Sequence, residues 1–284
     1  MPLVSTKEIH VNGGLRGYGV ASLMGSDLGM VIGLVRAAEE LRAPLLLVYN
    51  KDVNSSVPIE QGMPMISNAA RLARVPVATV LDHGFDMEII CKAIEYGAST
   101  VMFDGSMLAY EENIGRTREV VEYAHARGVT VEAELGSISG SAIDYQDAGP
   151  EANYTDPDVA AEFVARTGVD FLAVSFGNAH GIYRGVPRLD LDRVRAIYAR
   201  VDIPLVMHGA SGLDFSAYPP IIEAGITKVC YYTAMARTVA GNILDSLQKA
   251  GSSAAYHDII NWSVDHHYRA GKELMTLFGS AGKA

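Results

Sequence analysis

Three histidines each close a segment rich in apolar and β-branched residues. His83 ends the run VATVLDH, His180 follows FLAVSFGNA, and His208 ends IPLVMH. Because parallel α/β proteins place their chemistry at the carboxyl ends of strands, three such side chains can converge on one point. Neutral imidazoles are common ligands of Zn²⁺. The pattern therefore predicts a metal site built from three different strands.

Carboxylates stand near the same strand ends. Asp82 directly precedes His83, Asp104 ends the run VMFD, and Glu132 and Glu134 alternate along VEAELG. A metal that polarises a carbonyl needs a nearby carboxylate to move protons. Asp82 and Glu134 are therefore the catalytic candidates, and one of the two glutamates can orient a ligating imidazole. The structural alternatives are a helix N-cap for Asp82 and a buried ion pair for the glutamates.

A glycine-rich segment begins at the third histidine and reads HGASG. Gly209 lets the backbone approach a ligand, and Ser211 adds a hydroxyl group. Backbone N–H groups in such a loop, ahead of a helix, bind an anion without positively charged side chains. Gly181, which follows His180, is a second candidate N–H donor. The sequence thus predicts an anion pocket next to the metal site.

These residues need a scaffold that gathers several strand ends, and the chain provides eight apolar segments that alternate with helical stretches. This alternation predicts a parallel sheet covered by helices, and the count of eight favours a closed (β/α)8 TIM barrel. Composition does not shift along the chain, so we expect one domain over residues 1–284, with a helical extension after about residue 250. The predicted strands span residues 17–22, 44–50, 77–83, 99–106, 129–136, 170–177, 203–211 and 227–233.

Local signals place some of the helices and turns. Leu28, Val31, Ile32 and Val35 follow Ser26 at helical spacing, which predicts a helix with Ser26 as N-cap and these four residues on its buried face. Glycines stand between a helical stretch and the next strand, where a left-handed residue ends a helix. These glycines are Gly97, Gly128, Gly168 and Gly225.

One connection is unusually long. After VEAELG the chain runs through SISGSAIDYQDAGPEANY before Thr155, Asp156 and Pro157 open the next helix. Long loops at the carboxyl end of a barrel often act as lids or binding loops, although some are only decoration. We therefore expect this segment to lie over the site.

Composition limits the class of protein. The chain has 284 residues, a formal net charge of −10 and two cysteines. The acidic balance without basic clusters argues against nucleic-acid binding, and no window reaches the roughly 18 apolar residues of a membrane span. Two cysteines make no disulfide framework, and the first residues lack a signal-peptide pattern. We expect a soluble cytoplasmic protein that acts on a small molecule.

Taken together, the motifs resemble one family, the class II zinc-dependent ketose-bisphosphate aldolases, which include the fructose- and tagatose-bisphosphate aldolases. The similarity runs in order from about residue 70 to the end of the chain. It rests on LDHG at 81–84, VMFDGS at 101–106, VEAELG at 131–136, AHGIY at 179–183, VMHGASG at 206–212 and LFGSAGKA at 277–284.

The resemblance implies reversible cleavage of a ketose (bis)phosphate into dihydroxyacetone phosphate and an aldehyde. It implies one Zn²⁺ per subunit on His83, His180 and His208, an enediolate stabilised by that ion, and Asp82 as the acid/base. A monovalent cation beside the phosphate and a homodimer or homotetramer are further expectations. The implied substrate and phosphate pocket consists of Gly181, Gly209, Ala210, Ser211, Cys230, Tyr231, Tyr232 and Thr233.

The chain departs from the family at positions that face the substrate. Cys230 replaces an asparagine, and a thiol cannot supply the amide's paired donor and acceptor. Ala142 stands where the family loop carries a glutamate, and Asp144, two residues on, is the candidate substitute. The segments GYGVAS and LLLVYNKDV also lack the family's Ala-Phe-Asn and serine. We therefore expect conserved chemistry on a non-standard substrate.

Three alternatives stay open at this point. A metal-dependent sugar-phosphate epimerase or isomerase would also use a barrel, histidines and an enediolate. An aldolase acting on a non-phosphorylated ketose would keep the metal site and lose the phosphate. A barrel retained as a non-enzymatic scaffold would have an idle metal site.

Overall fold

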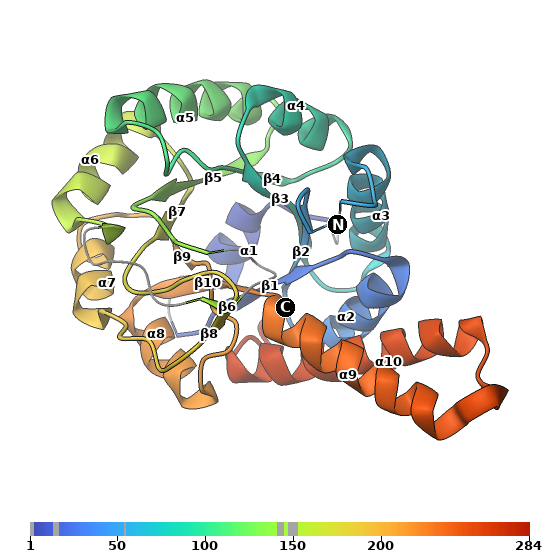
Figure 1. Cartoon of the computed structure of the whole chain (residues 1–284). Helices are drawn as coiled ribbons and strands as arrows, with labels where there is room; N and C mark the ends of the chain where they lie inside the picture. The colour runs from blue at the N-terminus through green and yellow to red at the C-terminus, as the bar shows by residue number, and fades with distance from the viewer. Residues whose placement is uncertain (1–2, 14–16, 54, 141–144, 147–152) are drawn as a thin grey trace.

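A computed structural model describes residues 3–13, 17–53, 55–140, 145–146 and 153–284. Eight parallel strands close into a barrel in the order β1-β10-β9-β7-β5-β4-β3-β2, which confirms the predicted TIM barrel (Figure 1). The strands are β1 (Val20–Met24), β2 (Leu45–Asn50), β3 (Val77–Gly84), β4 (Thr100–Phe103), β5 (Thr130–Leu135), β7 (Phe171–Val174), β9 (Leu205–Met207) and β10 (Ile226–Tyr231). Two short strands, β6 (Tyr145–Gln146) and β8 (Ile182–Tyr183), pair separately.

Helices surround the barrel and connect its strands (Figure 1). In the ring lie α2 (Leu28–Leu41), α3 (Ile59–Leu72), α4 (Met87–Glu95), α5 (Tyr110–His125), α6 (Pro157–Thr167), α7 (Leu191–Tyr198) and α8 (Tyr218–Ala224). The chain opens with α1 (Thr6–Gly13) and closes with α9 (Thr233–Ala250) and α10 (Tyr256–Leu277). No helix among the described residues has the length and apolar character to cross a membrane.

Every predicted strand segment contains a strand, and the four glycines that were expected to end helices all have positive φ, from 71° to 127°. The first strand begins later than the prediction of 17–22. Gly17 has a φ of 94°, which extended strand backbone does not adopt, and the strand starts at Val20. Gly17 therefore belongs to the connection that precedes this strand.

The prediction for α2 was wrong in two respects. Its N-cap is Asp27, whose Oδ1 accepts a hydrogen bond from the Met30 N–H at 2.9 Å, and not Ser26. Of the four residues expected on the buried face, Leu28 and Ile32 are 58% and 41% exposed. The physical reason is α10, which lies far away in sequence and packs along the face of α2 that contains Gly33. Leu28 and Ile32 are therefore not on the buried face.

The contact between α2 and α10 depends on Gly33. A Cβ atom at this position would lie only 2.4 Å from the carbonyl oxygen of Val264 in α10, so the two backbones could not approach as they do. The helical extension predicted after about residue 250 is thus α10, outside the barrel (Figure 1).

Candidate active site

Barrel closure brings the three predicted histidines together at the carboxyl ends of the strands. His83 lies in β3, His180 follows β7, and His208 follows β9. Their ring centroids are 4.7 Å apart for His83 and His208, 5.0 Å for His83 and His180, and 5.7 Å for His180 and His208. One ligand atom from each lies within 4.8 Å of the others, so the three imidazoles can share one ion.

The backbone of His83 explains how two consecutive residues face the same site. Its φ is 50°, in the left-handed region that residues other than glycine rarely adopt. The register between β3 and β4 shifts between Leu81 and Gly84 at this point. Such an irregularity at a strand end redirects a side chain, so Asp82 and His83 both reach the mouth.

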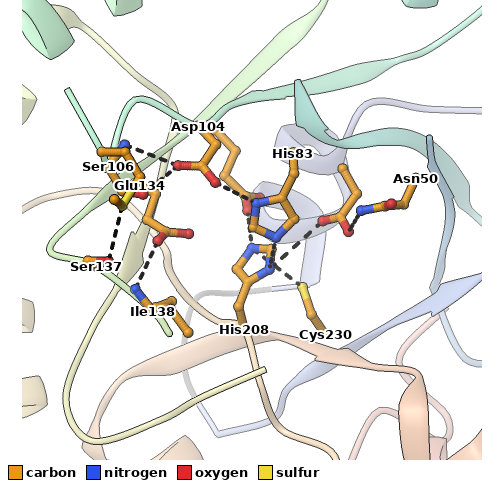
Figure 2. A network of polar contacts seen from close by, with 12 residues as sticks. Asn50, His83, Asp104, Ser106, Glu134, Ser137, Ile138, His208 and Cys230 are labelled. Atoms are coloured by element: carbon orange, nitrogen blue, oxygen red, sulfur yellow. Dashed lines mark hydrogen bonds and ion pairs between the residues drawn. The ribbon is translucent and has the colours of Figure 1, made fainter. Parts of the chain in front are cut away.

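Hydrogen bonds fix the orientation of two of the imidazoles. Nδ1–H of His83 donates to Oδ2 of Asp104 at 2.8 Å (Figure 2). Nε2–H of His208 donates to Oε1 of Glu132 at 2.9 Å. The opposite nitrogens, Nε2 of His83 and Nδ1 of His208, then face each other at 3.2 Å. Although burial opposes it, the nearby carboxylates raise the pKa of both rings, so a proton can bridge these two nitrogens. In the neutral tautomers both nitrogens carry lone pairs, and a shared cation would stabilise that arrangement.

His180 completes the set with an unpaired nitrogen. Among the described residues its Nε2 atom is buried and has no hydrogen-bond partner. Burial and the nearby charges of His83 and His208 lower the pKa of His180 to about 3, so the ring is neutral. A buried acceptor without a partner is costly, and a metal ion satisfies it. The donor set therefore fits Zn²⁺ or a similar ion.

Glu132 links the site to a buried cation. Its Oε2 lies 2.5 Å from Nζ of Lys228, and both side chains are fully buried inside the barrel. Although burial opposes ionisation, Lys228 and His208 hold the pKa of Glu132 below its usual value. Glu132 therefore stays a carboxylate and accepts the proton on Nε2 of His208.

Asp82 is held by a residue from the neighbouring strand. Nδ2 of Asn50 donates to Oδ2 of Asp82 at 3.1 Å, while Oδ1 of Asn50 accepts the N–H groups of Asp52 and Val53 at 3.0 and 3.2 Å. The other carboxylate oxygen, Oδ1 of Asp82, lies 3.8 Å from Nδ1 of His208. Asn50 thus orients the carboxylate toward the histidine cluster.

Glu134 lies near His83 and Asp104 and does not line the cavity. Its Oε1 accepts the Ile138 N–H at 3.3 Å, and its Oε2 is buried without a partner among the described residues. Burial and the charge of Asp104 raise the pKa of Glu134 to about 7. With His83 and Asp104 it forms a second group whose ligand atoms lie within 4.8 Å of one another.

A cavity of about 540 Å³ opens over the histidines. It is lined by most of the predicted site residues, namely Asp82, His83, His180, Gly181, His208, Gly209, Ser211, Cys230, Tyr231, Tyr232 and Thr233. Ala210 is buried beside it, with its carbonyl accepting the Tyr218 hydroxyl at 2.6 Å, and does not line it. Ala142 and Asp144 lie outside the described residues.

One side of the cavity has the expected features of an anion site. Gly209 has a φ of 66°, and a Cβ atom there would lie 2.2 Å from the carbonyl oxygen of Ala179, so no other residue fits. Oγ of Ser211 accepts the Tyr232 N–H at 3.1 Å, and the helix α9 begins at Thr233. The N–H groups at a helix start favour a negatively charged ligand.

Sequence reasoning missed several lining residues. Asn50 ends the run LLLVYN, and the rule that selected the histidines at strand ends would have selected it as well. Ser22 in β1 is paired in register with Cys230 in β10, and its hydroxyl is buried without a partner in the described part of the chain. Both residues line the cavity, although the Asn50 amide is already bonded to Asp82, Asp52 and Val53. Ser22 ends the segment GYGVAS, which the family resemblance marked as a departure facing the substrate without naming this residue.

The chain is similar to several known proteins. The family model for class II fructose-bisphosphate aldolase matches residues 4–283. Sulfofructosephosphate aldolase from Alkalicoccus urumqiensis is 33% identical over 100% of this chain and 99% of that protein. Protein YdjI of Escherichia coli strain K12 is 39% identical over 76% of this chain and 77% of its own. The crystal structure of the YdjI aldolase superposes with a TM-score of 0.87 and 33% identity, covering 99% of both chains.

Proposed function

The chain belongs to the class II fructose-bisphosphate aldolase family and is an aldolase, a lyase; within that family we propose that it cleaves a ketose phosphate to dihydroxyacetone phosphate with the help of zinc. The observation that supports zinc most directly is the pair of nitrogens 3.2 Å apart on His83 and His208. When both rings are neutral, Asp104 and Glu132 favour the tautomers in which neither of these nitrogens carries a proton. Nε2 of His180 also lacks a partner in the part of the chain that the structure describes, which supports three rings preorganised for a cation.

When bound by these residues, Zn²⁺ would act as a Lewis acid on the ketose carbonyl and stabilise the charge of the enediolate that cleavage leaves. The chain's own groups perform the remaining steps. Asp82 accepts the proton of the hydroxyl on the carbon whose bond breaks, and returns a proton in the synthetic direction. Asn50 holds its carboxylate in place through the bond to Oδ2.

A proton must also leave or reach the enediolate carbon when dihydroxyacetone phosphate is formed or used. We propose that Asp144 serves this part of the reaction and that Glu134, which does not line the cavity, takes part through the neighbouring His83 and Asp104. The raised pKa of Glu134, about 7, suits a group that exchanges protons near neutral pH. Asp144 belongs to the segment between β5 and α6 that follows Glu134 in the chain.

The phosphate of the substrate belongs at the anion side of the cavity. Gly181, Gly209 and Ser211 supply backbone N–H groups and a hydroxyl, and Thr233 adds the start of α9. A monovalent cation beside the phosphate would offset its negative charge. Tyr231 and Tyr232 flank this side, and the neighbouring Ala210 supports the turn by accepting the Tyr218 hydroxyl.

We further propose that the enzyme is a homodimer or homotetramer. The end of α9 and the start of α10 expose apolar side chains. Leu244, Tyr256 and Ile260 are 54%, 77% and 40% exposed. Exposed apolar residues gathered on one projecting element are typical of an interface. Light scattering coupled to size-exclusion chromatography measures the oligomer directly.

The decisive experiment is a cleavage assay coupled to detection of triose phosphate, run on zinc-stripped and zinc-loaded protein with a panel of ketose phosphates and free ketoses. The proposal expects cleavage of at least one ketose phosphate only after zinc is added. Exchange of substrate protons with solvent without any cleavage would instead support the epimerase. Cleavage of free ketoses alone would contradict the proposal that the substrate carries a phosphate.

A further inference from the structure

The cavity has two chemically different ends on opposite sides of the barrel mouth. In the closed strand order, β9 stands opposite β3, and β10 stands opposite β4 (Figure 1). The anion side follows β9 and β10. The other side, here called the distal end, is formed after β2, β3 and β4 by Asp52, Val53, Phe85, Ser106 and Met107.

The distal end is apolar with an acidic rim. Phe85 and Met107 are 55% and 84% exposed although they line a cavity, so they offer apolar surface to whatever enters. Asp52 brings a carboxylate to the rim, and its N–H donates to Oδ1 of Asn50 at 3.0 Å, which fixes its place. Ser106 lies deeper and donates its hydroxyl to Asp104 at 2.7 Å.

Positive charge is missing from this lining. Among the described residues that line the cavity, none is a lysine or an arginine. The segment 141–152, which joins β5 to α6, contains no lysine or arginine in its sequence but holds Asp144, Asp147 and Glu151. Lys51, next to Asp52, is exposed and does not line the cavity. A phosphate, carboxylate or sulfonate is normally held by such cations or by a nest of backbone N–H groups.

We propose that the aldehyde half of the substrate is uncharged, so that the ketose carries a single phosphate, on its dihydroxyacetone half. This inference rests on the aldolase function proposed above. Asp52 accepts hydrogen bonds from hydroxyl groups of a polyhydroxy aldehyde and repels a second anion. Phe85 and Met107 pack against the carbon chain of that aldehyde. The distal end thus determines which ketose is used, whereas the histidines determine the chemistry.

A matched pair of aldehydes tests the proposal in the synthetic direction. Zinc-loaded enzyme with dihydroxyacetone phosphate receives either D-glyceraldehyde or D-glyceraldehyde 3-phosphate, which differ only in the phosphate. We expect kcat/KM for glyceraldehyde to exceed that for its phosphate by about tenfold or more, since an unpaired like charge at a site costs at least that factor.

A charge reversal locates the effect. Asp52→Lys should raise the ratio of kcat/KM for the phosphorylated over the free aldehyde by about tenfold or more, with Asp52→Asn in between. Glu119→Lys on α5 makes the same change of charge at an exposed position outside the barrel mouth and should leave the ratio unchanged. Thermal melting checks that each variant is folded.

The possible failures are distinguishable. A preference for the phosphorylated aldehyde, or an Asp52→Lys ratio equal to that of the parent enzyme, overturns the uncharged aldehyde and leaves the aldolase assignment intact. If zinc-loaded enzyme forms no carbon–carbon bond with either aldehyde or with longer free aldoses, the proposed function fails and this inference fails with it.

Discussion

His208 donates a hydrogen bond from Nε2 to Oε1 of Glu132 at 2.9 Å, and this contact fixes which nitrogen of the ring faces the substrate cavity. Because the other oxygen of Glu132 lies 2.5 Å from Nζ of Lys228, the carboxylate is shared between a ligand candidate and a buried cation. All three side chains are almost fully buried. The orientation of His208 therefore depends on a charge balance inside the barrel.

Replacing Glu132 should expose that dependence. Glu132→Gln keeps the shape but leaves the buried Lys228 ammonium without a countercharge, so we expect the free energy of unfolding to fall by about 3–5 kcal/mol. Glu132→Gln combined with Lys228→Met removes both charges and should recover most of the loss. Urea unfolding of the zinc-free proteins measures this. A loss below about 1 kcal/mol in the single variant would show that the ion pair contributes little.

Removal of one imidazole tests the metal site. His208→Ala leaves two histidines and water, which hold Zn²⁺ far more weakly than three, so the purified variant should lose the metal on dialysis while the parent enzyme keeps it. His257→Ala, at a side chain that is 77% exposed on α10, is the matched control and should retain zinc. Elemental analysis of the dialysed proteins gives the answer, and full zinc occupancy in His208→Ala would refute the ligand set.

Asp82 can be separated from the metal ligands although it is adjacent to one of them. Asp82→Ala should retain zinc, because it removes no imidazole, but kcat for cleavage should fall by about 10² to 10⁴ without the proton acceptor. Asp245→Ala, at an exposed position on α9, is the control. Steady-state kinetics and zinc analysis on the same preparations decide the matter. Near-normal turnover in Asp82→Ala would remove this carboxylate from the mechanism.

The sequence could predict the barrel and the histidines because both follow from local patterns. Each histidine ends an apolar strand, and strand ends meet at one face of a parallel barrel wherever the strands occur in the chain. The position of His83 could be predicted from its own strand, without knowing which residues it contacts. The same holds for Gly209, whose motif already indicated a close backbone approach.

Partners that depend on tertiary contacts could not be predicted in this way. The bond from Asn50 to Asp82 follows from the register of β2 and β3, in which these two residues are opposite each other. The buried face of α2 was mispredicted because α10, from the other end of the chain, packs against the face of α2 that contains Gly33. The missing side chain of Gly33 allows the two helices to approach. Apolar spacing alone does not show on which side a distant helix will pack.

Asn50 offers a test of positioning as opposed to folding. Asn50→Ala removes the donor to Oδ2 of Asp82, and we expect kcat to fall about tenfold while KM and zinc content stay close to those of the parent, since one lost hydrogen bond is worth about that factor. Asn50→Gln should recover part of kcat if the amide reaches the carboxylate. Asn242→Ala on α9 controls for loss of an exposed amide. An unchanged kcat in Asn50→Ala would contradict the positioning role.

The raised pKa of Glu134 predicts how stability depends on pH in the zinc-free protein. A carboxyl whose folded pKa is about 7, above its unfolded value, binds its proton more tightly when folded, so its favourable contribution is complete below the unfolded pKa and disappears as pH rises through about 7. Glu134→Gln carries no such dependence. We therefore expect the free energy of unfolding of the parent, relative to Glu134→Gln, to fall by about 3 kcal/mol between pH 4 and pH 8. Urea unfolding of both proteins across this range measures the difference, and a difference that is constant with pH would mean that folding does not raise the pKa of Glu134.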